Sequence, residues 1–259
     1  MASAAELLQP LSPRVADLKR KLEHFVATRC IPSEELFEEQ AGVGSERWTH
    51  VPPVMEQLKE EARALGLWNL WLPKEFPQGA GLTNGEYAVL AEVTGRSLLA
   101  PEACNCSAPD TGNMEVLLRY GNNAQQAKWL EPILNGHIRS AFLMTEPAVA
   151  SSDATNIACT FTRRNEGGYV VNGRKWWSSG AMDPRCKVCV VMGRVVDAEG
   201  NATATSPYDV QSMLLVPMDA PGVTIVRALH VFGYDDAPHG HAEVDLCNVQ
   251  VYVAGCWHD

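Results

Sequence analysis

The stretch AFLMTEPAVASSDATNIACTF, residues 141–161, places a run of small and hydroxyl-bearing residues between two apolar, strand-like segments. Short apolar runs bounded by turn residues are typical of buried strands. The small side chains at residues 150–155 leave the backbone N–H groups of the run uncovered, so such a loop can wrap a phosphate or the edge of a heteroaromatic ring. On turn chemistry alone, a solvated surface loop whose Ser and Asp side chains cap their own backbone is the commoner outcome.

Short segments rich in β-branched and aromatic residues continue on both sides of this loop, and turn residues separate them. We predict strands at residues 142–145, 157–162, 169–171, 175–177, 188–192, 213–216, 223–226 and 242–246. Asn172-Gly173 lies between the third and fourth of these and is typical of a two-residue hairpin turn. The second half is therefore predicted to be an antiparallel β-barrel or β-sandwich.

The first half has the period of helices, because its apolar residues recur at three- and four-residue spacing. Ser12-Pro13 is typical of a helix start, and Thr83 with Glu86 has the spacing of a capping box. Further helices are predicted at residues 54–65, 114–118 and 123–135. Helices followed by strands predict an α+β fold class. We divide the chain into an all-α N-terminal helical domain, residues 1–138, and a β-barrel domain, residues 139–259.

Composition excludes several classes of protein. The 259 residues are 46% apolar and 20% charged, which is ordinary for a globular chain with a real core. The net charge is −10 and the basic residues are scattered, so nucleic acid is not an expected partner. No apolar run approaches the ~20 residues of a membrane span. The eight Cys form no disulfide framework, and we expect free, mostly buried thiols in a reducing compartment. The N-terminus lacks the pattern of a secretory signal.

A second candidate site is Trp176-Trp177-Ser178-Ser179. Neighbouring residues of a strand face opposite sides, so one Trp can fill the core while the other lines a cavity. There it would offer a flat face to a planar ligand, with the Ser hydroxyls at the ligand's edge. Two Trp in packing roles remain the equally open alternative.

Other motifs are weaker. Cys186-x-x-Cys189 runs into a strand, which favours buried thiols over a zinc or redox site. Two His near residue 240, His239 and His241, are expected to belong to a turn. The sequence contains no G-x-S-x-G, no P-loop and no G-x-G-x-x-G, so hydrolase, Walker and Rossmann readings lack their motifs.

Taken together, these segments resemble the acyl-CoA dehydrogenase family, and closely its eukaryotic branch whose longer members carry a phosphotransferase-like domain upstream. Residues 142–147, FLMTEP, are similar to the family's flavin-loop signature, and residues 151–153 occupy its small-Ser-Asp position. Residues 169–177, YVVNGRKWW, resemble its Tyr-(Ile/Val)-(Ile/Val)-Asn-Gly-x-Lys segment. Residues 221–223 and 232–234 resemble later markers of its β domain. The likeness runs from about residue 13 to residue 250.

The resemblance implies FAD as cofactor and acyl-CoA as substrate. It implies that Met144 and Thr145 meet the pyrimidine edge of the flavin, that Trp177 packs on the ring, and that Ser179 hydrogen-bonds near flavin N5. Ser152 would line the path of the cofactor and the acyl-CoA phosphates. The full set of implied cofactor-binding residues is Phe142, Met144, Thr145, Ser151, Ser152, Trp177, Ser178 and Ser179.

The implied activity is α,β-desaturation of acyl-CoA thioesters in fatty acid β-oxidation, with electron-transferring flavoprotein as acceptor. The family further implies homo-oligomers and a mitochondrial location. Its C-terminal four-helix domain has no counterpart after residues 248–251, and its catalytic Glu is expected in that missing domain, so we assign no catalytic residue. One alternative is an inactive truncated isoform that acts by binding or hetero-association. A remoter alternative is an all-β ligand-binding module with a helical cap.

Overall fold

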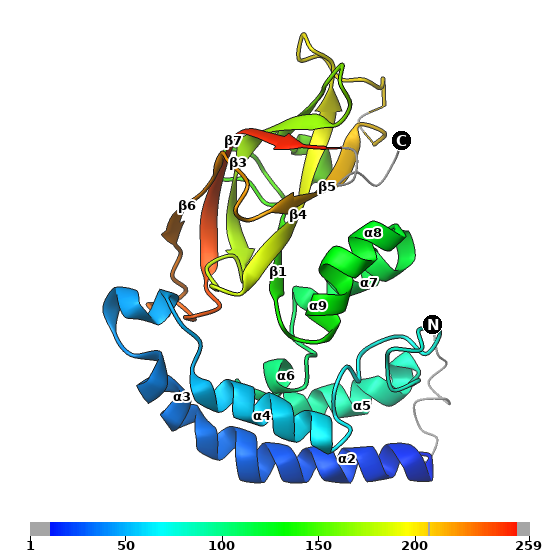
Figure 1. Ribbon diagram of the computed structural model, residues 1–259, viewed down its shortest axis with the longest axis vertical. Coiled ribbons are helices and arrows are strands. Elements are labelled where there is room, and N and C mark those ends of the chain that lie inside the picture. The colour runs from blue at the N-terminus through cyan, green and yellow to red at the C-terminus, as the bar shows by residue number, and fades with distance from the viewer. Residues whose placement is uncertain (1–10, 207, 253–259) are drawn as a thin grey trace. The chain divides into compact units, whose positions relative to one another are not determined.

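The computed structural model describes residues 11–206 and 208–252. The chain divides into two compact units, residues 1–111 and residues 112–259, and each unit has a hydrophobic core of its own (Figure 1). Helices come first and a β-sheet follows, which confirms the predicted fold class. Within the described part of the chain, every helix is too short or too polar to cross a bilayer.

The first unit is helical. Its helices are α2 (Pro13–Phe25), α3 (Glu34–Ala41), α4 (Pro53–Ala64), α5 (Asn84–Thr94) and α6 (Ala100–Ala103), with short helical turns η1 (Val26–Cys30), η2 (Ile31–Ser33) and η3 (Gly44–Trp48). The predicted starts are confirmed, since Ser12 caps α2 and the Thr83–Glu86 capping box opens α5. Helix α3 was not predicted, because its sequence EELFEEQA has too few apolar positions to show a period.

The second unit combines helical segments with a sheet. It contains α7 (Asp110–Tyr120), α8 (Asn123–Gln125), η4 (Gln126–Leu130), α9 (Glu131–Leu134), β1 (Arg139–Leu143), β2 (Thr160–Arg163), β3 (Tyr169–Ser179), β4 (Cys186–Val196), β5 (Gln211–Pro217), β6 (Val223–Ala228) and β7 (His241–Val251). Asn113 of α7 donates hydrogen bonds to Ser140 Oγ at 2.9 Å and to the Ala141 carbonyl at 3.1 Å, so α7 is fastened to β1. The predicted division at 138/139 follows the change from helix to strand, whereas the compact units divide at 111/112.

The sheet is mixed, so the prediction of a purely antiparallel barrel or sandwich is wrong for two pairings. Its strand order is β1-β4-β2-β3-β7-β6, and β5 pairs with β4. Strands β1 and β2 both run parallel to β4, and the other pairs are antiparallel. The cause is the length of β4, because β1 pairs with its first part and β2 with its last part along one edge. Strand composition does not encode this arrangement.

The predicted hairpin turn at Asn172-Gly173 is also wrong. Strand β3 runs through both residues without turning, and Figure 1 shows it beside β7. A Cβ on Gly173 would lie 2.7 Å from Cys159 Cβ, so glycine is required here by a close approach and not by a turn. Asn172 accepts a hydrogen bond from the Asn248 N–H at 2.8 Å across a register shift between β3 and β7.

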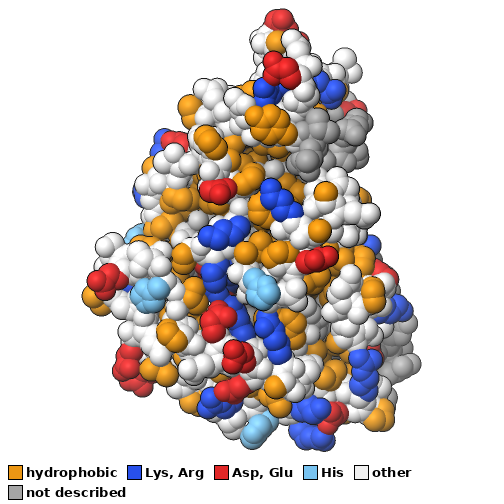
Figure 2. All heavy atoms as spheres, viewed as in Figure 1, with side chains coloured by type: hydrophobic (Ala, Val, Ile, Leu, Met, Phe, Trp, Pro, Cys, Tyr) orange, Lys and Arg blue, Asp and Glu red, His pale blue; other side chains and the backbone are white. Residues whose placement is uncertain are grey.

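The surface drawn in Figure 2 mixes charges of both signs. Acidic and basic side chains lie among one another over this face, with apolar side chains between them.

Candidate functional site

A break in the strand ladder on β4 creates the candidate site. Strand β1 ends at Leu143, opposite Val191, and β2 begins at Thr160, opposite Arg194. The chain between these strands, residues 144–159, leaves the sheet as a loop, which we call the excursion loop. The backbone N–H and C=O groups around the break have no hydrogen-bond partner on a neighbouring strand. Because buried backbone groups need such partners, side chains must supply them.

A buried ion pair fills this break. The Lys175 ammonium, on β3, donates to the Met144 carbonyl at 2.9 Å, to the Met192 carbonyl at 2.7 Å and to Glu146 Oε1 at 2.7 Å. Glu146 in turn accepts from the backbone N–H groups of Ala158 and Cys159, at 2.8 and 2.9 Å. The two side chains are 0% and 4% exposed. Every charge therefore has partners, and the two side chains join both ends of the excursion loop to β3 and β4.

Local hydrogen bonds shape the rest of the excursion loop. The Ser151 hydroxyl accepts from the Glu146 N–H at 2.9 Å and donates to the Glu146 carbonyl at 3.3 Å. Asp153 accepts from the hydroxyl and the N–H of Thr155, which hold the pKa of its carboxyl below the ordinary value. The loop thus caps its own backbone, as turn chemistry predicts, while its first residues are held by the sheet.

A bulge in β3 turns Trp177 outward. The register with β7 shifts between Lys175 and Ser178, and Trp177 has φ +52°, a value that is an outlier for a bulky residue. Its side chain is 41% exposed. At the bulge the Trp176 N–H donates to the Thr145 carbonyl at 3.0 Å, and Thr145 Oγ1 donates to the Trp176 carbonyl at 2.7 Å. Strain of this kind concentrates at functional sites.

A polar cluster lies beside this bulge. Ser179 Oγ is 2.9 Å from Nδ1 of His241, and the indole of Trp177 lies 6.2 Å from the same imidazole, centroid to centroid. His241 Nε2 is 3.7 Å from Asp236 Oδ2, and the His239 ring lies 6.3 Å away in an edge-on arrangement. A flat aromatic face and a row of hydroxyl and imidazole groups therefore lie next to one another.

The structure brings together some of the predicted site residues. A hydrogen bond links Thr145 to Trp176, whose ring lies against Trp177, and the ring of Trp177 is linked through His241 to Ser179. Met144 is held beside them through its carbonyl.

The other predicted cofactor residues take no part in these contacts around Trp177. Phe142 is half-buried on β1 opposite Val190, and Ser152 is exposed on the excursion loop. Ser151 bonds within its own loop. The Ser178 hydroxyl is buried and reaches no hydrogen-bond partner within the described residues. The cofactor roles of all these residues stay predictions.

Sequence reasoning gave no role to Glu146, Lys175 or His241. A signal for Lys175 existed, because it shares the inward parity of Val171 on one strand. The predicted hairpin at Asn172-Gly173 interrupted that strand and hid the signal. His241 carried no sequence signal, since its partner Ser179 is 62 residues away.

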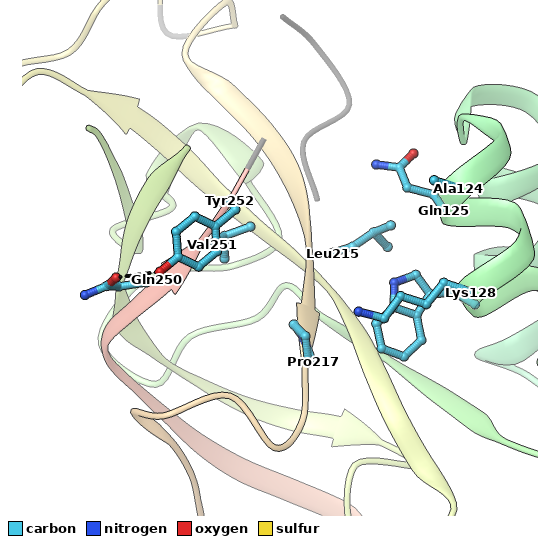
Figure 3. Close-up of a pocket in the computed structure, with 9 residues that line it drawn as sticks. Ala124, Gln125, Lys128, Leu215, Pro217, Gln250, Val251 and Tyr252 are labelled. Atoms are coloured by element: carbon cyan, nitrogen blue, oxygen red, sulfur yellow. Dashed lines mark hydrogen bonds between the residues drawn. The ribbon is translucent and has the colours of Figure 1, made fainter. Parts of the chain in front are cut away.

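A separate cleft of about 250 Å³ lies between the helical segment of the second unit and the sheet (Figure 3). Its helical side is formed by Ala124, Gln125, Lys128 and Trp129, and its sheet side by Leu215, Pro217, Gln250, Val251 and Tyr252. In Figure 3 the Tyr252 hydroxyl bonds Gln250 Oε1, at 3.2 Å. None of the predicted cofactor residues lines this cleft.

Cys186 and Cys189 are free and buried, as predicted, whereas Cys106 is half-buried and Cys247 is exposed. Burial raises the pKa of the Cys159 thiol to about 11 and that of Cys189 to about 12, so both remain protonated at neutral pH. Over the described residues, no three His, Cys, Asp or Glu side chains gather in a way that could hold a metal ion.

This fold and these motifs are those of the acyl-CoA dehydrogenase family, and two family models match them. The model of the acyl-CoA dehydrogenase N-terminal domain matches residues 13–137, and the model of the acyl-CoA dehydrogenase middle domain matches residues 141–247. The chain therefore belongs to the acyl-CoA dehydrogenase family, of which it carries these two domains.

Individual proteins of this family are similar to the chain in sequence and in fold. The chain is 53% identical over 246 residues to acyl-CoA dehydrogenase family member 10 of Mus musculus, covering 93% of this chain and 22% of that protein. A solved acyl-CoA dehydrogenase from Mycobacterium abscessus is 47% identical, with a TM-score of 0.87 over 96% of this chain and 61% of that one. A glutaryl-CoA dehydrogenase from Mycobacterium smegmatis in complex with FADH2 is 21% identical and shares the fold, with a TM-score of 0.69, over 98% of this chain and 57% of that one. The chain thus spans less than two thirds of these relatives.

Proposed function

We propose that this chain supplies the helical and β-domain part of an FAD-dependent acyl-CoA dehydrogenase that introduces an α,β double bond into acyl-CoA thioesters. The observation that carries the proposal is the buried ion pair between Glu146 and Lys175. It fastens the Thr-Glu-Pro loop to the Asn-Gly-x-Lys strand, so the two sequence motifs of the family lie side by side.

The residues fit a flavin. A flavin is a flat aromatic system with a polar edge, and Trp177 offers an exposed indole face held by a strained backbone. Thr145 is hydrogen-bonded to Trp176, the neighbour of Trp177, and the Ser179 hydroxyl bonds His241, whose ring lies 6.2 Å from the indole of Trp177. The complex of the M. smegmatis relative with FADH2 supports the choice of ligand.

In the proposed reaction each residue binds or orients. When bound, the flavin supplies the two-electron redox chemistry. Trp177 would pack against the ring, Met144 and Thr145 would hold its pyrimidine edge, and Ser179 would hydrogen-bond beside N5. Lys175 and Glu146 keep the loop in place without touching the ligand. We assign no base for the substrate α-proton to any residue here.

The whole protein's role is also proposed on the family resemblance. It would work in fatty acid β-oxidation in mitochondria, as a homo-oligomer, and pass electrons to an electron-transferring flavoprotein. One solved neighbour, at 19% identity, is named as such a flavoprotein from Acidaminococcus fermentans, which supports only a common fold. Import of the tagged full-length protein into mitochondria would test the location.

The test is to titrate the purified chain with FAD and follow flavin fluorescence, then to assay a series of acyl-CoA thioesters with an artificial electron acceptor. Bound flavin with turnover supports the full proposal. Bound flavin without turnover favours the alternative of an inactive isoform that acts by binding. No flavin affinity in the chain or in the full-length protein would contradict the proposal.

Trp177→Ala is the sharpest variant, because it removes the exposed face while the indole contributes little to the core. Stacking of one aromatic ring is worth about 0.5–1.5 kcal/mol, so we expect FAD affinity to fall roughly twofold to tenfold. Trp68→Ala, a tryptophan of the helical unit, is the matched control and should leave FAD affinity unchanged.

A further inference from the structure

The cluster beside Trp177 contains a hydroxyl and an imidazole that share one hydrogen bond. Ser179 is the last residue of β3 and His241 is the first residue of β7, and the two are partners in the ladder. Ser179 Oγ and His241 Nδ1 are 2.9 Å apart. The other ring nitrogen, Nε2, faces the carboxylate of Asp236 at 3.7 Å. Neither Asp236 nor His241 had a role in the motifs that relate the chain to its family.

A hydroxyl has one proton to donate, and the imidazole decides where it points. When a neutral imidazole carries its proton on Nε2, Nδ1 is an acceptor and takes the Ser179 proton. Ser179 then offers only lone pairs to a ligand. When the imidazole is protonated, both ring nitrogens are donors, and Nδ1–H donates to Ser179 Oγ. The proton of Ser179 is then free to be donated to a ligand.

We propose that His241 is a positioning residue that sets whether Ser179 presents a proton or a lone pair to the flavin, so that flavin binding by this chain depends on pH through the Ser179–His241 pair. The inference rests on the proposed flavin site. Oxidised flavin N5 carries a lone pair and no proton, so it is an acceptor. The Asp236 carboxylate beside Nε2 favours the Nε2–H tautomer of the neutral ring, and from that tautomer protonation of His241 strengthens the binding of oxidised FAD.

The charged groups around His241 fit this role. The loop before β7 contributes Asp236 to Nε2 and the ring of His239 edge-on. On β3, the groups that face His241 are the uncharged Ser179 and Trp177. The charges farther along the strands are already paired. Arg174 of β3 bonds Glu243 and lies 3.4 Å from Asp245, and Arg227 of β6 bonds Glu243.

The experiment measures the Kd of oxidised FAD for the full chain at pH values from about 5.5 to 8.5, the range in which histidine side chains ordinarily change charge. One hydrogen bond gained or lost predicts a Kd about twofold to tenfold weaker at the alkaline end. The absorption spectrum of the bound flavin should shift over the same range, because its hydrogen bonding changes.

Three variants test whether the pH dependence of FAD binding comes from the His241 imidazole, from the Ser179 hydroxyl or from a neighbouring histidine. His241→Asn places an amide where Nδ1 was, so it retains a partner for Ser179 but does not titrate. We expect it to bind FAD with a Kd that no longer varies with pH. Ser179→Ala leaves the imidazole in place and should also abolish the variation, because the effect passes through the hydroxyl. His239→Asn is the matched control, and it should keep the wild-type variation. Circular dichroism melts check that each variant is folded.

Each outcome decides something. A His241→Asn chain with the wild-type pH variation would overturn the proposal. A Ser179→Ala chain with that variation would also overturn it, because the imidazole charge would then act on the cofactor directly. Equal FAD affinity at every pH would contradict this inference alone, whereas no FAD binding at any pH would contradict the proposed function as well.

A readout without flavin tests the pair itself. The imidazole ¹⁵N resonances of His241 should move in the flavin-free Ser179→Ala chain, because Nδ1 loses its partner, and should move little in the His239→Asn chain. Unmoved Nδ1 resonances in Ser179→Ala would contradict the contact on which the inference depends.

Discussion

The Lys175 ammonium takes the place of a missing piece of strand. Where β1 stops and β2 has not begun, the carbonyls of Met144 and Met192 have no partners in the ladder, and Lys175 donates to both. Glu146 does the same for two N–H groups on the other side of the break and also neutralises the ammonium. The cost of burying two charges is offset because each of them also satisfies backbone groups.

Removing one member of this ion pair should therefore lower the free energy of unfolding strongly. We expect Lys175→Met to lower the free energy of unfolding of the β unit by about 3–5 kcal/mol, because Glu146 is left buried without its cation. Glu146→Gln should also be destabilising, because the two N–H groups donate to different carboxylate oxygens and the amide keeps an acceptor for only one of them. Urea unfolding followed by tryptophan fluorescence measures both changes.

The double variant Lys175→Met with Glu146→Gln isolates the pair. Its loss should be smaller than the sum of the single losses, because no unpaired charge remains. Lys187→Met is the matched control on the same sheet, since its side chain is exposed, and it should change the unfolding free energy by less than about 0.5 kcal/mol. Strict additivity of the two single variants would contradict the coupling.

A glycine beside the same break allows a second test. A Cβ on Gly173 would lie 2.8 Å from Cys159 Sγ and 2.9 Å from Cys159 Cα, so Gly173→Ala forces β2 and β3 apart. We expect a loss of about 1–3 kcal/mol in urea unfolding. Gly85→Ala is the control, because its Cβ meets open space in helix α5, and it should be neutral or stabilising by up to about 1 kcal/mol. Equal effects at the two positions would contradict the close approach at Gly173.

At the scale of an element, helix α5 shows how one turn of sequence sets a helix start. Thr83 Oγ1 accepts from the Glu86 N–H at 3.2 Å, and the Glu86 carboxylate accepts from the Thr83 N–H at 2.8 Å. These bonds use donors that a helix start leaves without partners. They also lower the pKa of Glu86, with the Thr83 N–H as the largest cause and the Thr83 hydroxyl as the second.

Thr83→Ala should lower the unfolding free energy of the helical unit by about 0.5–2 kcal/mol at pH 7. Glu86 has a depressed pKa in the folded state, so its contribution is present above the unfolded value of about 4.3 and is lost as the pH falls through the folded value. The difference between wild type and variant should therefore shrink below about pH 4. Thermal or urea unfolding at pH 7 and at acidic pH measures it.

Thr83→Ser is the control for this prediction, because it keeps the hydroxyl and should stay within a few tenths of a kcal/mol of wild type. A Thr83→Ala penalty that is the same at pH 7 and at pH 3.5 would show that the Glu86 carboxylate is not coupled to the Thr83 hydroxyl, since the Thr83 N–H keeps its bond to that carboxylate in both chains.

At the scale of the whole molecule, the chain carries two separate cores. The core of the helical unit includes Leu58 and Phe25, and the core of the β unit includes Val191 and Phe161. No residue belongs to both clusters. Stability that depends on buried apolar contacts should then be distributed between two units.

Leu58→Ala should remove about 2–5 kcal/mol from the helical unit, since the side chain is fully buried and leaves a cavity. Hydrogen exchange followed by mass spectrometry should show faster exchange in the helices of the first unit and unchanged protection in strands β3, β4 and β7. Val191→Ala is the reciprocal variant and should speed exchange in the sheet alone. Faster exchange in both units from either variant would show that the chain unfolds as one cooperative body.

The sequence predicted the parts of the fold that local interactions decide. Apolar spacing and caps located the long helices, and the short β-branched runs located the strands. The excursion loop was predicted to face a ligand only when its sequence was read together with the family motifs. The prediction failed at Asn172-Gly173, because the dipeptide that favours a turn also serves where two backbones approach, and the partner Cys159 is distant in sequence.

The sequence by itself determined the order of helices and strands, the caps, and the motifs that place the chain among acyl-CoA dehydrogenases. Only the tertiary structure decided which strands run parallel, where the ladder breaks, and that Lys175 and Glu146 close the break. It also decided that Ser179 meets His241. The physical reason is that these features depend on register between distant segments, and register is fixed by packing across the sheet, which local propensity does not encode.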